Sequence, residues 1–383
     1  MTPSQPAAVT ARPGALSQQQ MLGQLITFPA YRTPPEAPAR RFEAEVRRLW
    51  GGRLTPMMAS ADTSGRYALA PLACPATACT GALELAAGAH SEPWRNPDAI
   101  ECLVCVEGSV EVRYGPELDR AITLGRFDML SLPEGVRHQL RNAGAGVARV
   151  VSVLSIAPAA RYDAVFDQAL AAQVPAEAQS ALGLRFDAER GAAIDTAVIE
   201  GRVTRFEKLV PYKKDLNRTG GLPAEATESL SAGNVYPLIV PEGHVGRSRT
   251  APMYGNQGLY ISIAECKTGD DGPPPHAHTD TQESFFVLDG AFDMCTGFDN
   301  ESGVKTQAGD LIAMPSNVMR SFRNTTDQPA RLLVIIQGPD RMNDTVFFSR
   351  RVGEGLARRF GENAIAEYAK IKMTFDAEQR LGV

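Results

Sequence analysis

Two stretches of the chain, ESFFVLDG at Glu283–Gly290 and ECLVCVEG at Glu101–Gly108, share the pattern that decides the fold. Each begins with glutamate, continues as an apolar run, and ends with an acidic residue and glycine. A second pair, PSNVMRSFRN at Pro315–Asn324 and PEGVRHQLRN at Pro133–Asn142, keeps the same separation of 182 positions. Unrelated segments would not keep this register without a gap, so we predict two copies of one structural unit.

Each copy has the pattern of short β-strands, in which apolar or alternating runs lie between turn residues. The predicted strands of the first copy are Val110–Tyr114, Asp128–Leu132 and Val147–Ile156, and those of the second are Leu259–Ala264, Ser284–Leu288, Asp310–Met314 and Arg331–Gln337. Short strands at this spacing are typical of an antiparallel sandwich or barrel. The sequence therefore predicts a mostly β protein with two barrels in tandem.

The segments outside the repeat have a partly helical pattern. We expect a partly helical N-terminal segment, a first barrel, a linker of helices and loops, a second barrel and a helical C-terminal segment, at 1–60, 61–157, 158–232, 233–342 and 343–383. Apolar residues between 21 and 26 (Met21, Leu22, Leu25 and Ile26) fall on one helical face, and further helical pieces are predicted at 40–50, 160–170, 176–182 and 353–371. We expect these segments to pack on the barrels or on a partner subunit, and we predict a homo-oligomer.

Composition and charge narrow the classes of function. The 383 residues carry a net charge of −5 and no dense basic block, which argues against nucleic-acid binding and against attraction to an anionic membrane. No run reaches the ~18 apolar residues of a membrane span. The first residues also lack the apolar core of a secretory signal, so we expect a cytoplasmic protein.

The cysteines do not suggest a disulfide scaffold, since there are six in a chain of this length. Cys102 and Cys105 form a C-x-x-C within a strand-like run, where residues three apart point to opposite faces. We therefore expect both to be buried apolar side chains rather than metal ligands. No role is assigned to Cys74 or Cys79.

A candidate metal site lies in the run GPPPHAHTDTQE at Gly272–Glu283. His276 and His278 are two residues apart, so on a strand they share one face. Glu283 follows closely along the chain. Imidazole and carboxylate together suit divalent transition metals, with Fe(II) favoured here and Mn(II), Ni(II), Co(II) or Zn(II) as alternatives. We predict one such ion per chain.

The spacing of these residues is similar to the first sequence motif of the cupin superfamily. The second cupin motif is matched by a glycine, an aspartate, a proline and an asparagine, namely Gly309, Asp310, Pro315 and Asn324. The resemblance implies two jelly-roll barrels. The two-barrel layout resembles oxalate decarboxylases, quercetin dioxygenases and gentisate dioxygenases, without favouring one of them.

The second copy departs from the cupin pattern at one ligand. Cupins usually supply a fourth ligand, a histidine, where this chain has Arg320, and a guanidinium remains protonated. Arg320 could turn outward, pair with Glu283, or lie beside the metal and hold an anionic group of a substrate. His244, just before the second barrel, could act as a replacement ligand or lie on the surface.

The first copy departs further from the pattern. It keeps Glu101 and His138, but Trp94 and Asn96 stand where the motif has its two histidines. We therefore expect the first barrel to bind no metal. Trp94 is predicted to fill the space of the ion, and Glu101 and His138 to bond to each other or to nearby backbone.

The leading functional hypothesis is a non-haem Fe(II) dioxygenase acting on a small oxygen-bearing substrate, with Arg320 binding an anionic group of it. It rests on the open three-ligand site and on the resemblance to two-barrel dioxygenases. One alternative is a cupin isomerase, decarboxylase or cyclase that uses the metal as a Lewis acid. Another is a small-molecule binding protein without catalysis. Fold alone does not decide among them.

Overall fold

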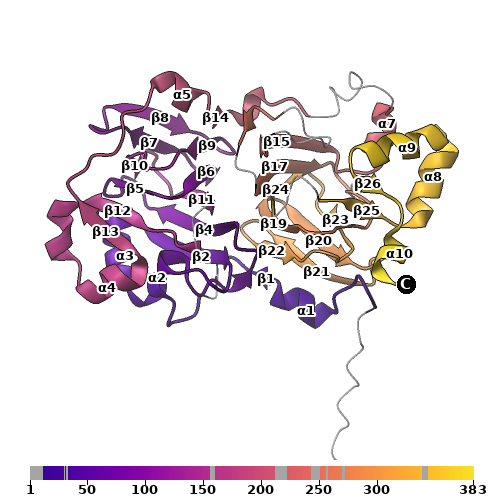
Figure 1. Ribbon diagram of the computed structural model, residues 1–383, viewed down its shortest axis with the longest axis horizontal. Coiled ribbons are helices and arrows are strands. Elements are labelled where there is room, and N and C mark those ends of the chain that lie inside the picture. The colour runs from indigo at the N-terminus through magenta and orange to yellow at the C-terminus, as the bar shows by residue number, and fades with distance from the viewer. Residues whose placement is uncertain are drawn as a thin grey trace, which may run out of the picture.

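A computed structural model describes residues 12–29, 31, 33–155, 160–211, 222–242, 251–255, 258–269, 272–338 and 344–383. His244 lies outside the described residues, so its proposed role as a ligand has no structural account here. The chain forms two β-barrels that lie side by side (Figure 1). Helices α3 and α4 lie at the outer side of the first barrel, and α8 and α9 at the outer side of the second (Figure 1).

The first barrel consists of a seven-stranded and a six-stranded sheet. Their strand orders are β14-β9-β6-β11-β4-β2-β3 and β13-β12-β5-β10-β7-β8. The strands are β2 (Arg53–Ala59), β3 (Leu72–Ala73), β4 (Ala78–Leu85), β5 (Trp94–Arg95), β6 (Ile100–Glu107), β7 (Val110–Tyr114), β8 (Arg120–Leu124), β9 (Met129–Leu132), β10 (His138–Arg141), β11 (Ala148–Ser155), β12 (Ala164–Asp167), β13 (Leu184–Asp187) and β14 (Val203–Thr204). The strands predicted at 110–114, 128–132 and 147–156 are thus confirmed.

The second barrel repeats this plan, again with seven and six strands. The orders are β1-β22-β19-β24-β17-β15-β16 and β21-β20-β23-β18-β25-β26. The strands are β1 (Leu25–Ile26), β15 (Asn234–Val240), β16 (Met253–Tyr254), β17 (Leu259–Cys266), β18 (His276–His278), β19 (Gln282–Asp289), β20 (Ala291–Thr296), β21 (Ser302–Gln307), β22 (Leu311–Met314), β23 (Arg320–Asn324), β24 (Ala330–Gln337), β25 (Val346–Phe348) and β26 (Met373–Thr374). All four strands predicted in this copy are present.

The strand pairs keep the register of the sequence repeat. Trp94 pairs with Phe166 in the first barrel, and His276 pairs with Phe348 in the second, each 182 positions later. The repeat therefore continues into β12 and β25, in segments expected to be linker and C-terminal helices. The sheets also include β2, which begins at Arg53 within the expected N-terminal segment, so their edges do not coincide with the expected boundaries.

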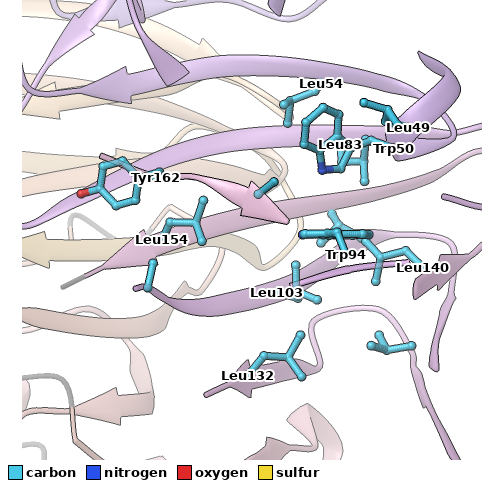
Figure 2. Close-up of a cluster of buried hydrophobic side chains, with 14 of the residues drawn as sticks. Leu49, Trp50, Leu54, Leu83, Trp94, Leu103, Leu132, Leu140, Leu154 and Tyr162 are labelled. Atoms are coloured by element: carbon cyan, nitrogen blue, oxygen red, sulfur yellow. The ribbon is translucent and has the colours of Figure 1, made fainter. Parts of the chain in front are cut away.

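Five buried apolar clusters lie within the described residues, and three of them fill or join the two barrels. One fills the first barrel and includes Trp94 and several leucines (Figure 2), and a second fills the interior of the other barrel. A third joins the outer faces of the two seven-stranded sheets. Cys102 belongs to this third cluster and Cys105 to the first, which confirms that the two cysteines point to opposite faces of β6. None of the six cysteines forms a disulfide.

Two short strands at matching positions extend the seven-stranded sheets, and one of them, β1, crosses between the barrels. Strand β1, which precedes the first barrel, pairs with β22 of the second, and β14, which precedes the second barrel, pairs with β9 of the first. Asp310 accepts a bond from the Phe28 backbone N–H at 2.8 Å, and Asp128 accepts one from the Phe206 backbone N–H at 3.0 Å. Strand β1 therefore ties the N-terminal segment to the second barrel, whereas β14 stays with the first barrel, which it follows in the chain.

The helices are short and lie mainly outside the sheets. They are α1 (Gln18–Gly23), α2 (Pro38–Arg41), α3 (Glu43–Trp50), α4 (Ala176–Leu182), α5 (Thr196–Glu200), α7 (Ala224–Glu228), α8 (Arg350–Phe360), α9 (Glu362–Lys370) and α10 (Ala377–Leu381). The pieces predicted near 40–50, 176–182 and 353–371 are confirmed. Among the described residues, none of the helices has the length and apolar character to cross a membrane.

Two helical predictions were wrong. Leu25 and Ile26 form β1 rather than the end of a helix, because they pair with the edge strand β22. The segment 160–170 forms β12 and the start of a 3₁₀ helix, because β12 pairs with β5 and β13. In both cases sheet pairing outweighs local helical periodicity. The N-terminal segment contacts its own chain, through a bond from the Leu16 N–H to Thr296, and association into an oligomer stays a prediction.

Candidate metal centre

Three candidate ligands meet inside the second barrel. His276 and His278 are on β18 of the six-stranded sheet, and Glu283 is on β19 of the facing sheet. The Nε2 atoms of the two histidines lie 3.6 and 3.7 Å from Oε2 of Glu283. All three side chains are buried, and within the described residues they are the one group of this kind that could hold a metal. The structure thus brings the predicted residues together.

Hydrogen bonds fix the orientation of both imidazole rings. Nδ1 of His276 contacts the Pro274 carbonyl oxygen at 3.0 Å, and Nδ1 of His278 contacts Oδ2 of Asp344 at 2.8 Å. These acceptors place the proton of a neutral ring on Nδ1, which leaves a lone pair on Nε2. Burial, together with the charge of Arg320, lowers the pKa of His278 to about 4 against the opposing effect of Asp344. His278 is therefore a neutral ring at neutral pH.

The arrangement fits a transition-metal ion. Ligand atoms bound to one ion at ~2.1 Å lie about 3–3.4 Å apart at octahedral or tetrahedral angles. The observed separations of 3.6 and 3.7 Å exceed this only slightly. Two imidazole nitrogens and one carboxylate are also the donor set of non-haem Fe(II) sites, in which further coordination positions stay open. The residues present are therefore suited to an ion of this class.

Arg320 lies inside the barrel beside these ligands. It is on β23, is fully buried, and its Nε donates a hydrogen bond to Oε2 of Glu283 at 2.8 Å. Its Nη1 donates to the Val318 carbonyl oxygen at 2.9 Å. Among the described residues, its Nη2 has no hydrogen-bond partner. The outward orientation is therefore wrong, and pairing with Glu283 is observed together with one unused donor.

The charges around Glu283 decide its ionisation. Burial raises the pKa of the Glu283 carboxyl, but the charge of Arg320 and the two histidines outweigh that effect and hold the pKa well below its usual range. Glu283 is therefore a carboxylate. With Asp344 it gives two negative charges against the one positive charge of Arg320. A divalent cation would bring this local sum to one positive charge, which favours an additional anionic ligand.

The first barrel places other residues at the matching positions. The Trp94 ring lies 4.1 Å from the His138 ring, measured between centroids, within the aliphatic core (Figure 2). Nε2 of His138 is 3.3 Å from Oε2 of Glu101, and its Nδ1 contacts the Val136 carbonyl oxygen at 3.0 Å. Glu101 also accepts a 2.6 Å bond from Asn96. Trp94 is thus buried beside His138, and His138 bonds to nearby backbone. Its Nε2 lies close to Glu101 but has no hydrogen-bond partner among the described residues.

Two buried residues were missed by the sequence reasoning. Arg66 donates to Oδ1 of Asn96 at 2.7 Å and to the Tyr162 carbonyl oxygen at 3.1 Å, which places a positive charge near Glu101. Asp344 bonds to His278 from a segment 66 positions away. Neither residue lies in a sequence motif. Their burial is the signal that marks them, and burial becomes visible only in the folded structure.

The sequence pattern of the Cupin domain family matches the chain twice, at residues 81–154 and 262–336. The chain therefore contains two cupin domains and is a bicupin, as the repeat had suggested. No curated protein is significantly similar to it in sequence. The identification therefore covers the family and the fold.

Solved structures with a similar chain fold include a vicilin, a 7S globulin and an oxalate decarboxylase. Vicilin from Corylus avellana (hazelnut) has a TM-score of 0.46 and 13% identity over 78% of this chain and 87% of that chain. The 7S globulin of Momordica charantia has a TM-score of 0.47 and 14% identity over 75% of this chain and 86% of that chain. Oxalate decarboxylase from Bacillus subtilis has a TM-score of 0.43 and 16% identity over 70% of each chain. Similarity at this level assigns no activity to the chain.

Proposed function

We propose that the second barrel binds one divalent transition metal per chain, with Fe(II) favoured, and that the protein is a dioxygenase for a small anionic substrate. The observation that carries the proposal is the convergence of two Nε2 atoms and one carboxylate in a buried site. This donor set is characteristic of non-haem Fe(II) oxygenases. When bound, Fe(II) would supply open coordination positions and the redox chemistry that dioxygen activation requires.

Arg320 is proposed as the residue that binds the substrate. Its Nη2 is buried and has no hydrogen-bond partner among the described residues, so a ligand that accepts from it would remove the cost of an unmade bond. A carboxylate matches the guanidinium, because charge-assisted bonds to a planar donor group are strong. The net positive charge that the site would carry with a divalent ion also favours an anionic ligand.

Different residues of the chain would then bind the metal, orient the substrate and exclude water. His276, His278 and Glu283 would hold the ion, and the Nδ1 contacts would keep both imidazole Nε2 lone pairs turned towards it. Arg320 would orient the substrate while its Nε keeps Glu283 ionised. The surrounding apolar cluster, which includes Phe285 and Met314, limits water near the site.

Metal analysis combined with nitric oxide binding tests this proposal. Protein loaded anaerobically with Fe(II) should bind one ion per chain, and nitric oxide should give the high-spin iron–nitrosyl signal in electron paramagnetic resonance. His278→Ala should abolish both. Fe(II) that binds without a nitrosyl signal would mean that no coordination position is open, and would contradict the dioxygenase.

Oxygen consumption separates the alternatives. A dioxygenase consumes O2 in step with loss of a chelating carboxylate such as a small hydroxy acid. Turnover of the same substrate by the Zn(II) or Mn(II) protein without O2 would instead indicate Lewis-acid catalysis. Saturable binding without product for any loaded metal would indicate a small-molecule binding protein.

A further inference from the structure

We infer that Asp344 is a positioning residue of the metal site, which fixes the tautomer and the orientation of His278. The inference rests on the proposed metal binding and goes beyond it, because Asp344 is not a ligand. Its Oδ2 accepts from Nδ1 of His278 at 2.8 Å. A carboxylate in this place holds the Nε2 lone pair of the imidazole towards the ion and raises its basicity.

The Asp344 carboxylate is held by the turn that follows β18. Oδ2 accepts a bond from the Thr281 hydroxyl at 2.7 Å. Oδ1 accepts from the Thr279 hydroxyl at 3.0 Å and from the Asp280 backbone N–H at 2.9 Å. The Asp344 side chain is fully buried. A carboxylate with donors on both oxygens cannot rotate without losing bonds, so it sets the plane of the His278 ring.

Asp344 also ties the C-terminal part of the chain to the ligand strand. It lies just before β25, which pairs with β18 over all three residues from His276 to His278. Backbone bonds continue this contact, from Thr279 N–H to the Thr345 carbonyl oxygen at 3.0 Å. The ligand strand is therefore supported on one side by β25, a strand of the same sheet that lies beyond the expected C-terminal boundary of the barrel.

The first barrel supplies an internal comparison. The positions 182 residues before Asp344, Thr279 and Thr281 are Tyr162, Pro97 and Ala99. None of these side chains can reproduce a buried carboxylate held by two hydroxyl groups. The position matching His278 is Asn96 in the same barrel. The carboxylate thus occurs in the copy that has an imidazole to orient and is missing from the copy that has none.

His276 shows why the effect should be specific to one ligand. Its Nδ1 contacts a backbone carbonyl oxygen, that of Pro274, and its ring stacks on Phe348 at 5.4 Å between centroids. A carbonyl dipole supports the ring without a full negative charge. His278 is therefore the ligand whose affinity for the ion depends on a side chain that can be replaced.

The test compares Asp344→Asn with the matched control Asp280→Asn. Both remove one carboxylate charge near His278, but the Asp280 side chain is exposed, and its Oδ2 accepts a bond from the Thr279 hydroxyl at 3.1 Å. Metal-free proteins would be titrated with Co(II), followed by its visible absorption. We expect Asp344→Asn to bind Co(II) about 10- to 100-fold more weakly, and Asp280→Asn to bind within about twofold of the unchanged protein.

A spectroscopic readout separates positioning from general stability. Long-range 1H–15N NMR spectra of the metal-free protein report which ring nitrogen carries the proton. His278 should be protonated on Nδ1 in the unchanged protein and in Asp280→Asn, and should give a mixture of tautomers in Asp344→Asn. If Asp344→Asn does not fold, Thr281→Val carries the test, because it removes the hydroxyl that donates to Asp344 and lies 2.9 Å from Nδ1 of His278. The expected loss in Co(II) affinity is about two- to tenfold.

The outcomes distinguish this inference from the proposed function. If the unchanged protein binds Co(II) but the folded Asp344 or Thr281 variant binds equally well with an unchanged tautomer, the positioning role is wrong and the metal site stands. If the unchanged protein binds neither Co(II) nor Fe(II), the proposed function is wrong, and the NMR spectra still show whether Asp344 fixes the His278 tautomer.

Discussion

The two barrels each place a buried arginine near a buried glutamate, but they reach this arrangement from different elements. In the second barrel Arg320 on β23 bonds directly to Glu283. In the first, Arg66 from the 3₁₀ helix Gly65–Tyr67 acts through Asn96, which bonds to Glu101. The same scaffold thus brings a positive charge towards the glutamate by two routes.

The difference lies in how fully each carboxylate is satisfied by the protein. Glu101 accepts 2.6 Å bonds on both oxygens, from Asn96 and from Ser152. The position matching Ser152 is Val334, an apolar residue of the second core. A carboxylate that has all its partners within the protein offers little to a cation, whereas Glu283 faces two imidazole lone pairs. One hydroxyl-to-apolar exchange and two histidines are thus among the differences between the first barrel and the candidate metal site of the second.

The largest expected effect is on metal content. Glu283→Gln should reduce the bound metal from one ion per chain to almost none, as should His276→Ala, because the remaining ligands cannot hold the ion. Glu101→Gln should leave the content unchanged. Elemental analysis of protein purified without added metal measures both. Two ions per chain, or loss of metal in Glu101→Gln, would show that the first barrel also binds metal.

The next effect concerns stability in the first barrel. His138→Ala removes a fully buried ring that packs against Trp94, so we expect a loss of about 2–4 kcal/mol in the free energy of unfolding. Turnover by the folded variant should be unchanged. Urea denaturation gives the free energy. Unchanged stability combined with lost turnover would assign a second functional site to this barrel.

The ionisation of Glu101 makes this contribution depend on pH. Burial raises the pKa of its carboxyl, but His138, Arg66 and Ser152 together lower it from 4.5 to about 2. Because the folded pKa is depressed, the stabilisation is present above pH 4.5 and is lost as the pH falls towards 2, by up to about 3 kcal/mol. Glu101→Gln should flatten the stability profile in this window. An identical profile would mean that Glu101 is not held ionised.

The effect of Arg320 should fall on ligand binding rather than on metal. In Co(II)-loaded protein, Arg320→Ala should keep the ion and bind salicylate, a small chelating carboxylate, about 10- to 100-fold more weakly. Arg320→Lys should recover part of the loss, since a point charge lacks the planar donor pair. Arg320→His could restore a four-ligand site with tighter metal binding. Loss of metal in Arg320→Ala, or unchanged salicylate affinity, would refute the anchoring role.

The smallest effect concerns the aspartates beside the short strands β1 and β14. Asp128 accepts bonds from the Phe206 N–H and from the Arg205 guanidinium. Asp310 accepts a bond from the Phe28 N–H but, among the described residues, none from an arginine. Asp128→Ala should therefore cost about 0.5–1 kcal/mol more than Asp310→Ala, the range of a partly exposed ion pair. Urea denaturation of the two variants measures the difference. Equal costs would mean that Arg205 adds nothing to this contact.

The sequence by itself determined the repeat, most strands and the three candidate ligands. Their signals are local, since strand alternation and the spacing of His276 and His278 depend on neighbours along one strand. The register of 182 positions then placed Glu283 and Arg320 relative to Glu101 and His138 without knowledge of the fold. Local signals failed at Leu25–Ile26 and at 160–170, where a distant edge strand set the conformation.

The tertiary structure alone decided what surrounds those ligands. It turned Arg320 inward onto Glu283, brought Arg66 to Asn96 across 30 positions, and placed Asp344 on His278 across 66 positions. Such contacts depend on which distant segments the fold brings to the barrel interior and on which rotamer a buried charge adopts there. A buried charge is tolerated only beside its partners, and those partners become neighbours only when the two sheets enclose them.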